Sequence, residues 1–202
     1  DIGYVDLIIV FVKSTSTEEA LNKNSVLLGP DTIVLSLQNG YGNIAQIEKY
    51  VDADNIIAGT TSHGSTMLGP GHIKHAGIGK TYIGWAYKKE DKRINKIADI
   101  LVRSGFDTII SNNIMESIWS KLIINAGINA LTAILKVENG EILKYEETKQ
   151  IIKMEVGEAV KIARASGVFL NEDDMYKRVI KVAGDTSKNK SSMLQDILNK
   201  KK

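Results

Sequence analysis

The first third of the chain alternates between short apolar runs and amphipathic segments. Residues 5–13 contain a continuous run of apolar, mostly β-branched side chains from Leu7 to Val12, which is typical of a strand covered on both faces. Two further buried strands are expected within residues 32–40 and 55–64, and helical patterns at residues 16–29 and 43–51 separate the three. This regular alternation of strand and helix is typical of a parallel α/β sheet.

The pattern changes near Thr60. Residues 60–86 are rich in Gly and Thr, and their short alternating stretches predict two or three antiparallel strands joined by tight turns. An amphipathic helix is expected within residues 89–106, where Gly105 ends it, and a last strand within residues 107–112.

Every segment after Asn112 has a helical pattern. The first helix is long and apolar, and we expect a break in it near Gly127. The pattern divides the chain into an α/β domain, residues 1–111, and an all-α domain, residues 112–202. The expected helices of the second domain are residues 113–135, 139–145, 146–166, 172–186 and 191–199.

Composition narrows the class of protein. The chain has 202 residues, of which 43% are hydrophobic and 25% charged, which suits one or two soluble domains with real cores. A net charge of +2, with no basic stripe interleaved with aromatics, gives nucleic-acid binding little support. No apolar run approaches the ~18 residues of a membrane span, so we expect no membrane partner and a cytoplasmic location.

A metal centre is not expected. The chain contains no cysteine, which excludes disulfides and thiolate metal sites. Its three histidines include His72 and His75, whose spacing in a strand-like stretch is poor for coordinating one ion. Any chemistry must therefore come from other side chains or from a bound organic cofactor.

The glycine-rich segment at residues 40–45 matches the dinucleotide fingerprint G-x-G-x-x-A, and it follows a strand and opens a helix. The fingerprint also needs an acidic residue or an arginine at the end of the next strand, and residues 59–64 offer neither. Two other interpretations remain. The segment is a turn that requires glycine geometry, or it lies at the carboxyl edge of a parallel sheet and places Asn39 at the mouth of a ligand site.

Lys121, Asn125 and Asn129 interrupt the long apolar helix at positions i, i+4 and i+8, which lie on one stripe. Buried polar groups cost free energy unless something pairs with them. Taken singly, the lysine could extend its amine to solvent, and the asparagines could serve helix packing. Together they suit an amine that protonates a developing oxyanion and amides that bind a substrate hydroxyl.

Six segments occur in the order and at the spacing found in ketopantoate reductases, and the resemblance extends from about Asp6 to Asp196. These enzymes are NADPH-dependent 2-dehydropantoate 2-reductases of pantothenate biosynthesis, which transfer hydride to a 2-oxo acid. The last two segments are the most specific. The six are residues 7–13, 36–43, 59–64, 69–84, 117–134 and 189–197.

The resemblance implies a fold and a set of roles. The expected fold is α/β, the C-terminal half of a Rossmann-type parallel sheet domain followed by an all-α domain like the C-terminal domain of 6-phosphogluconate dehydrogenase, with the active site between them. Lys121 would be the catalytic acid. The implied substrate-binding residues are Asn125, Asn129, Ser192, Asn139 and Asn189. The implied NADPH-binding residues are Lys13, Asn39 and Gly40.

The sequence also departs from the family pattern. The Gly-rich loop of the first Rossmann strand and a glutamate beyond the segment at 189–197 have no counterpart, and Ala130 replaces a common proline. We therefore expect the chain to begin within the cofactor domain and, by itself, to bind NADPH weakly and be inactive. Two alternatives stay open: a same-fold reductase of another 2-oxo acid, and a non-catalytic fragment or paralogue that only binds or dimerises. A homodimer is compatible with each.

Overall fold

The computed structural model describes residues 2–87 and 90–200 of the chain. The chain divides into two compact units, residues 1–118 and 119–202, and each is described here by itself. The helix α4 (Ile114–Leu135) begins in the first unit and continues into the second. The domain boundary expected from the sequence, between residues 111 and 112, lies just before this helix.

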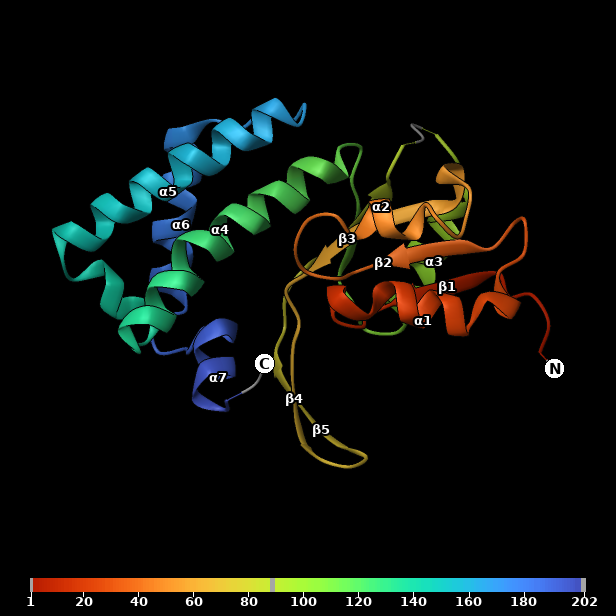
Figure 1. Cartoon of the computed structure of the whole chain (residues 1–202), viewed down its shortest axis with the longest axis horizontal. Helices are drawn as coiled ribbons and strands as arrows, with labels where there is room; N and C mark the ends of the chain where they lie inside the picture. Colours follow the sequence, from red (N-terminus) through yellow and green to blue (C-terminus); the bar gives the residue numbers. More distant parts are fainter. Residues whose placement is uncertain (1, 88–89, 201–202) are drawn as a thin grey trace. The chain divides into compact units, whose positions relative to one another are not determined.

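The first unit is built on a five-stranded sheet with strand order β1-β2-β3-β6-β7 (Figure 1). β1, β2 and β3 run parallel, β6 runs antiparallel to β3, and β7 runs parallel to β6. The predicted parallel α/β start is confirmed, and the later strands make the sheet mixed. The strands are β1 (Leu7–Val10), β2 (Ile33–Ser36), β3 (Ile56–Thr61), β6 (Thr81–Trp85) and β7 (Thr108–Ile110).

Helices cover both faces of this sheet. α1 and α2 pack on one face through a cluster that includes Leu21, Val34 and Ile47, and α3 packs on the other through Ile97 and Leu101. Because both faces are covered, all four residues of β2 are buried, as their apolar run predicted. The helices are η1 (Ser14–Ser16), α1 (Thr17–Lys23), η2 (Ser25–Leu27), α2 (Asn43–Ile47), η3 (Ala53–Asn55) and α3 (Arg93–Arg103).

The expected helix at residues 89–106 corresponds to α3. Its predicted first residue, Lys89, lies outside the described residues. Gly105, which follows the helix, adopts φ +90°, a conformation that glycine reaches at little cost. The predicted glycine stop is therefore confirmed.

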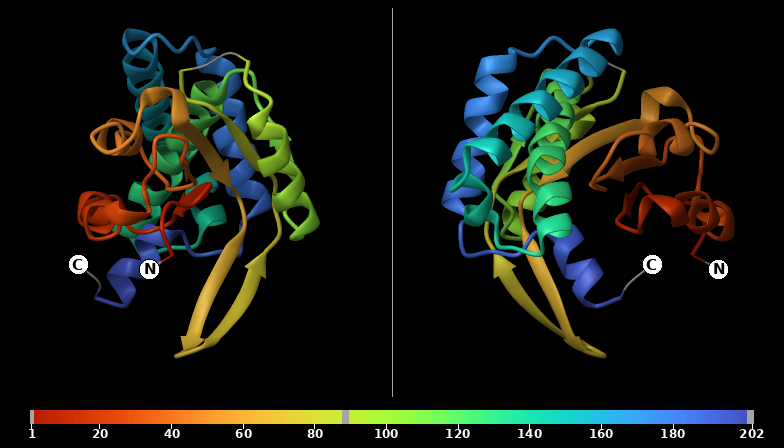
Figure 2. Two further views of the ribbon diagram at one scale, coloured as in Figure 1. Left: turned by 90° about the vertical axis from the view of Figure 1, so that its right-hand side faces the viewer. Right: turned by 60° about the vertical axis from the view of Figure 1, so that its left-hand side comes forward.

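The Gly- and Thr-rich segment forms a separate hairpin of β4 (Gly64–Gly69) and β5 (His72–Gly77). Figures 1 and 2 show this hairpin extending beyond the five-stranded sheet of the same unit. At its base, His63 Nδ1 and His75 Nε2 lie within hydrogen-bond distance, 3.0 Å apart, and His63 packs edge-on against Phe106. The two imidazoles therefore tie the strand that enters the hairpin to the strand that leaves it.

The second unit contains most of α4 and the helices that follow it. α4 is continuous through Gly127, so the break expected there is wrong. A Cβ atom at Gly127 would lie 3.0 Å from Cγ1 of Val179, so glycine serves close packing between α4 and α6. The later helices are η4 (Asn139–Leu143), α5 (Glu146–Ala165), α6 (Glu172–Asp185) and α7 (Ser192–Leu198).

An asparagine cap and a glycine with positive φ mark ends of these helices. Asn171 accepts a hydrogen bond from the amide of Asp174 (3.0 Å) at the start of α6, and Gly167 with φ +81° follows α5. The hydrogen bond to Asn171 satisfies the main-chain amide of Asp174, which the helix itself leaves without a partner.

One helix of the described part of the chain, α4, is long and apolar enough to cross a membrane by length and composition. The expectation that no segment approaches this length was therefore wrong. Of its most apolar stretch, 44% is buried inside the protein. Core helices of soluble proteins pass the same test, so the finding carries little weight.

Replacing Gly84 of β6 by alanine should destabilise the first unit. A Cβ atom there would lie 2.6 Å from the carbonyl oxygen of Ser111 and 2.7 Å from Cβ of Ile114. Overpacking of this kind costs about 1–3 kcal/mol, so the midpoint of urea unfolding should fall, as measured by tryptophan fluorescence. Gly69→Ala is the matched control, because nothing lies within 4 Å of a Cβ atom at that position. Equal midpoints for the two variants would contradict the packing described for β6.

Candidate active site

The helix α4 brings three polar side chains onto one stripe of the second unit. Because the helix is unbroken from Ile114 to Leu135, Lys121, Asn125 and Asn129 follow one another turn by turn, as the sequence predicted. All three side chains are half-buried. A substrate that reached this stripe would meet an ammonium and two amides in a row.

Burial changes the acidity of Lys121. It lowers the pKa of the ammonium below its usual 10.5, since surroundings of low polarity disfavour the charged form. A lysine with a lowered pKa gives up its proton more readily near neutral pH. The environment of Lys121 therefore favours the proton donor that the sequence analysis expected there.

The two amides of the stripe have different surroundings. Asn129 Nδ2 lies 3.4 Å from Oγ of Ser192, the first residue of α7, which is a long contact for a hydrogen bond. Within the described part of the chain, the Asn125 amide forms no hydrogen bond. Both amides therefore keep donor and acceptor capacity for a ligand.

A pair of buried hydroxyls lies beside this contact. Thr132 Oγ1 and Ser191 Oγ are 2.7 Å apart, and both residues are buried. Ser191 is also the N-cap of α7, where it accepts a hydrogen bond from the amide of Leu194 (3.1 Å). Thr132 was not among the site residues expected from the sequence, although it lies about one turn after Asn129 on the same helix.

Asn139 and Asn189 hold the segment that leads into α7. The amide of Asn139 donates to the carbonyl oxygen of Asn189 (3.0 Å), and Asn139 Nδ2 donates to Oγ1 of Thr186 (2.9 Å). The Asn139 side chain is buried, and its Oδ1 has no hydrogen-bond partner among the described residues, whereas Asn189 is exposed. Their binding of substrate stays a prediction.

The expected cofactor residues lie at one edge of the sheet in the first unit. Lys13 follows β1 and Asn39 follows β2, and because these strands are parallel neighbours, both residues lie at the carboxyl edge. Both are exposed. Gly40 and Gly42 adopt φ +94° and +91°, so this turn does require glycine geometry.

Gln38 connects the two loops at this edge. Its Nε2 donates to the carbonyl oxygen of Val12 (2.7 Å) and to Oγ1 of Thr17 (2.8 Å), the buried first residue of α1. The residue before Asn39 is thereby bonded to the residue before Lys13. Gln38 was not among the site residues expected from the sequence, because nothing in the local pattern indicates a hydrogen-bond partner 26 positions away.

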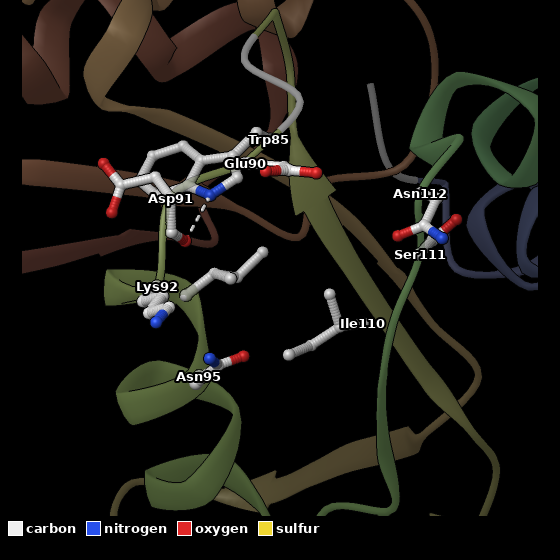
Figure 3. Close-up of a pocket in the computed structure, with 9 residues that line it drawn as sticks. Trp85, Glu90, Asp91, Lys92, Asn95, Ile110, Ser111 and Asn112 are labelled. Atoms are coloured by element: carbon white, nitrogen blue, oxygen red, sulfur yellow. Dashed lines mark hydrogen bonds between the residues drawn. The ribbon is translucent and has the colours of Figure 1, made fainter.

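A pocket lies elsewhere in the first unit. Figure 3 shows this pocket of about 370 Å³, in which Trp85 Nε1 donates to the carbonyl oxygen of Asp91 (3.0 Å). Trp85 pairs with Ile57 near the start of β3, so the pocket lies at the edge opposite to Lys13 and Asn39. It holds none of the predicted site residues. Among residues 2–87 and 90–200, no cluster of three or more metal-ligating side chains is found.

A sheet that begins with parallel α/β units, followed by a helical unit, is the architecture of a Rossmann-type domain with a helical domain after it. Residues 1–87 match the family profile described as "Ketopantoate reductase PanE/ApbA", and residues 113–202 match "Ketopantoate reductase PanE/ApbA C terminal". The chain belongs to the ketopantoate reductase family. The resemblance drawn from the sequence is therefore confirmed.

Relatives of known sequence and structure agree with this assignment. A 2-dehydropantoate 2-reductase of Halobacterium salinarum is 36% identical over 195 residues, which cover 95% of this chain and 63% of the relative. A ketopantoate reductase of this family from Ralstonia eutropha superimposes with a TM-score of 0.87 at 30% identity, covering 100% of this chain and 65% of its own. This chain thus spans less than two thirds of the relatives' length.

A third similar protein is named for a different activity. The structure of D-mandelate dehydrogenase with NADH and anilino(oxo)acetate matches with a TM-score of 0.91 at 31% identity. The match covers 98% of this chain and 64% of the dehydrogenase. Similar folds therefore serve more than one small acid and hold NADH in at least one case.

The lowered pKa of Lys121 should make the stability of the protein depend on pH. Between that lowered pKa and 10.5, the unfolded state binds more protons than the folded state, so unfolding becomes harder as pH rises. The wild type should therefore gain stability relative to Lys121→Met as the pH rises toward 10.5, measured by urea unfolding.

Lys153→Met is the matched control, because Lys153 is an exposed lysine of α5. Its difference from the wild type should stay flat over the same pH range. A flat difference for Lys121→Met as well would show that burial does not shift the pKa of Lys121.

Proposed function

We propose that the whole protein to which this chain belongs is a nicotinamide-dependent reductase that converts the 2-oxo group of 2-dehydropantoate to the hydroxyl of (R)-pantoate. The observation that carries this proposal is the stripe on α4, where a lysine with a lowered pKa is followed by two amides. The family and its curated relatives support the same reaction.

Lys121 has the properties that ketone reduction requires. Addition of hydride to a ketone leaves negative charge on the carbonyl oxygen, and an ammonium beside that oxygen stabilises the charge and then supplies the proton. Burial strengthens this interaction, because charges attract more strongly away from water. We assign Lys121 as the catalytic acid.

The neighbouring polar groups suit the rest of the substrate. 2-Dehydropantoate carries a hydroxyl and a carboxylate in addition to its ketone. Amides both donate and accept hydrogen bonds, so Asn125 and Asn129 suit the hydroxyl, and the Ser192 hydroxyl suits the carboxylate. Asn139 and Asn189 would act mainly by supporting the segment before Ser192, given their hydrogen bonds.

The sheet unit offers residues that fit a nicotinamide cofactor. Lys13 and Asn39 are exposed polar side chains at the carboxyl edge of parallel strands, and Gly40 has no heavy atom within 4 Å of its would-be Cβ. A bound nicotinamide would supply the hydride. Lys13 and Asn39 would orient its ribose and amide, and Gly40 would let the cofactor approach the main chain. We propose NADPH from the family resemblance, and NADH is the competing cofactor.

A second candidate function is the reduction of a different 2-oxo acid. The similarity to D-mandelate dehydrogenase favours this alternative, because that fold matches with a TM-score of 0.91. The oxo acid related to mandelate has an aromatic ring and no hydroxyl, so it would use Asn125 and Asn129 less than 2-dehydropantoate does. The two amides therefore distinguish the two substrates.

Removing the Lys121 amine should abolish most of the activity. In the protein expressed from its complete gene, Lys121→Ala should lower kcat for 2-dehydropantoate by about 10²-fold or more, the usual range for a lost general acid. The measurement is the oxidation of NADPH, followed by absorbance. Lys153→Ala on α5 should leave kcat unchanged, and an equal rate for Lys121→Ala and the wild type would remove Lys121 from the mechanism.

A substrate panel tests the assignment of the amides. We expect 2-dehydropantoate to have the highest kcat/KM among 2-oxo acids, and Asn125→Ala and Asn129→Ala to lower it by about tenfold or more each. The same variants should alter kcat/KM for the oxo acid of mandelate much less. A preference for the aromatic acid in the wild type would favour the second candidate. The absence of turnover with every 2-oxo acid and either cofactor would contradict both.

A further inference from the structure

We propose that Thr132 and Ser191 are positioning residues that hold Ser192 at the substrate stripe of α4. This inference rests on the proposed function, because it concerns the place where the substrate carboxylate would bind. Neither residue would touch the substrate. Their role would be to connect α7, which begins with Ser192, to the turn of α4 that carries Asn129.

The geometry shows a buried chain of hydrogen bonds. Thr132 Oγ1 lies 2.7 Å from Ser191 Oγ, 2.8 Å from the carbonyl oxygen of Ile128 and 3.1 Å from that of Asn129. Ser191 Oγ accepts a hydrogen bond from the amide of Leu194 at 3.1 Å. Thr132 is 0% exposed and Ser191 6%, so water does not compete effectively for either hydroxyl.

The hydroxyl pair joins donors and acceptors of both helices. Each hydroxyl has one proton, and the carbonyl oxygens beside Thr132 can only accept. The Thr132 hydroxyl donates toward Ser191 Oγ and the carbonyl oxygens of α4, and Ser191 Oγ accepts from Thr132 and from the amide of Leu194. Removing either hydroxyl would take a partner from buried polar groups, which is costly.

Little else fixes the position of α7. The helix has seven residues, and Leu194 is its one buried residue. The segment before it is held by Asn139 and Gly140, whose amides donate to the carbonyl oxygens of Asn189 and Ser187 (both 3.0 Å). The hydroxyl pair is therefore the shorter of the two polar contacts described between the start of α7 and α4.

The contact that faces the stripe is weak by comparison. Asn129 and Ser192 are 3.4 Å apart, so their mutual hydrogen bond contributes little to holding the two helices together. Thr132 and Ser191 are their near neighbours in sequence and meet at 2.7 Å. The strong bond thus lies in the interior, and Asn129 and Ser192 stay available for a ligand.

Removing one hydroxyl should weaken substrate binding selectively. In the protein expressed from its complete gene, Thr132→Val keeps the shape of the side chain and should raise KM for 2-dehydropantoate about tenfold. KM for NADPH should stay within about twofold, because the change lies in the helical unit. Thr132→Ser restores the hydroxyl and should restore KM.

Thr148→Val is the matched control. The Thr148 hydroxyl also donates to main-chain carbonyl oxygens, those of Ile142 and Tyr145, but it lies at the start of α5. This variant should leave KM for the substrate unchanged. An unchanged KM in a folded Thr132→Val, or a raised KM that Thr132→Ser does not restore, would overturn the proposal.

The two hydroxyls should also act as one unit. Ser191→Ala alone should raise KM about as much as Thr132→Val, and the double variant should raise it about tenfold rather than about a hundredfold. Independent, multiplying effects would show that the two hydroxyls do not work through each other and would overturn the pairing.

Hydrogen exchange tests the connection without relying on activity. In Thr132→Val, the amide of Leu194 should exchange at least about tenfold faster than in the wild type, while amides of α5 keep their rates. An unchanged rate for Leu194 would overturn the proposal even in an active enzyme. A wild type that reduces no 2-oxo acid would instead overturn the proposed function, and faster exchange would then still show that the pair anchors α7.

Discussion

The burial of one ammonium group on an apolar helix is the constraint on which the helical unit depends. Lys121 is half-buried on α4, and its pKa is lowered because the charged form is poorly solvated there. A protein tolerates such a cost more readily where the charge has a use, and the proposed reaction, which creates negative charge beside the amine, would recover it. The packing of this helix and the pKa of Lys121 therefore depend on the same residues, since the apolar neighbours that form the core also lower that pKa.

In the sheet unit, the main constraint is that two loops leave the sheet at the same edge. β1 and β2 are parallel, so the chain leaves both strands on the same side, and Gln38 joins the two departing loops through Val12 and Thr17. The turn after β2 then requires two glycines with positive φ. Each loop thus has a fixed starting point, while Lys13 and Asn39 remain exposed.

Much of this arrangement could be predicted because it depends on local periodicity. The buried strands β2 and β3, the amphipathic α3 and the stripe of Lys121, Asn125 and Asn129 all follow from apolar spacing, whereas β1, at the edge of the sheet, is less buried than its apolar run predicted. The prediction of a break at Gly127 was wrong. Glycine is needed there for close packing against Val179, 52 positions away, and no local pattern encodes that contact. The hydroxyl pair of Thr132 and Ser191 escaped notice for the same reason, since 59 positions separate its members. Long-range contacts of small or polar side chains could not be predicted from the sequence.

Gly127 also limits how the stripe can vary. It lies on the side of α4 roughly opposite to Asn125 and Asn129, where the helix meets Val179 of α6. Any larger residue would push the two helices apart by tenths of an ångström, and the amides on the far side would shift with the rigid helix that carries them. Hydrogen bonds to a substrate are sensitive to displacements of this size. The geometry of the proposed substrate site would thus depend partly on a helix–helix contact that no substrate reaches.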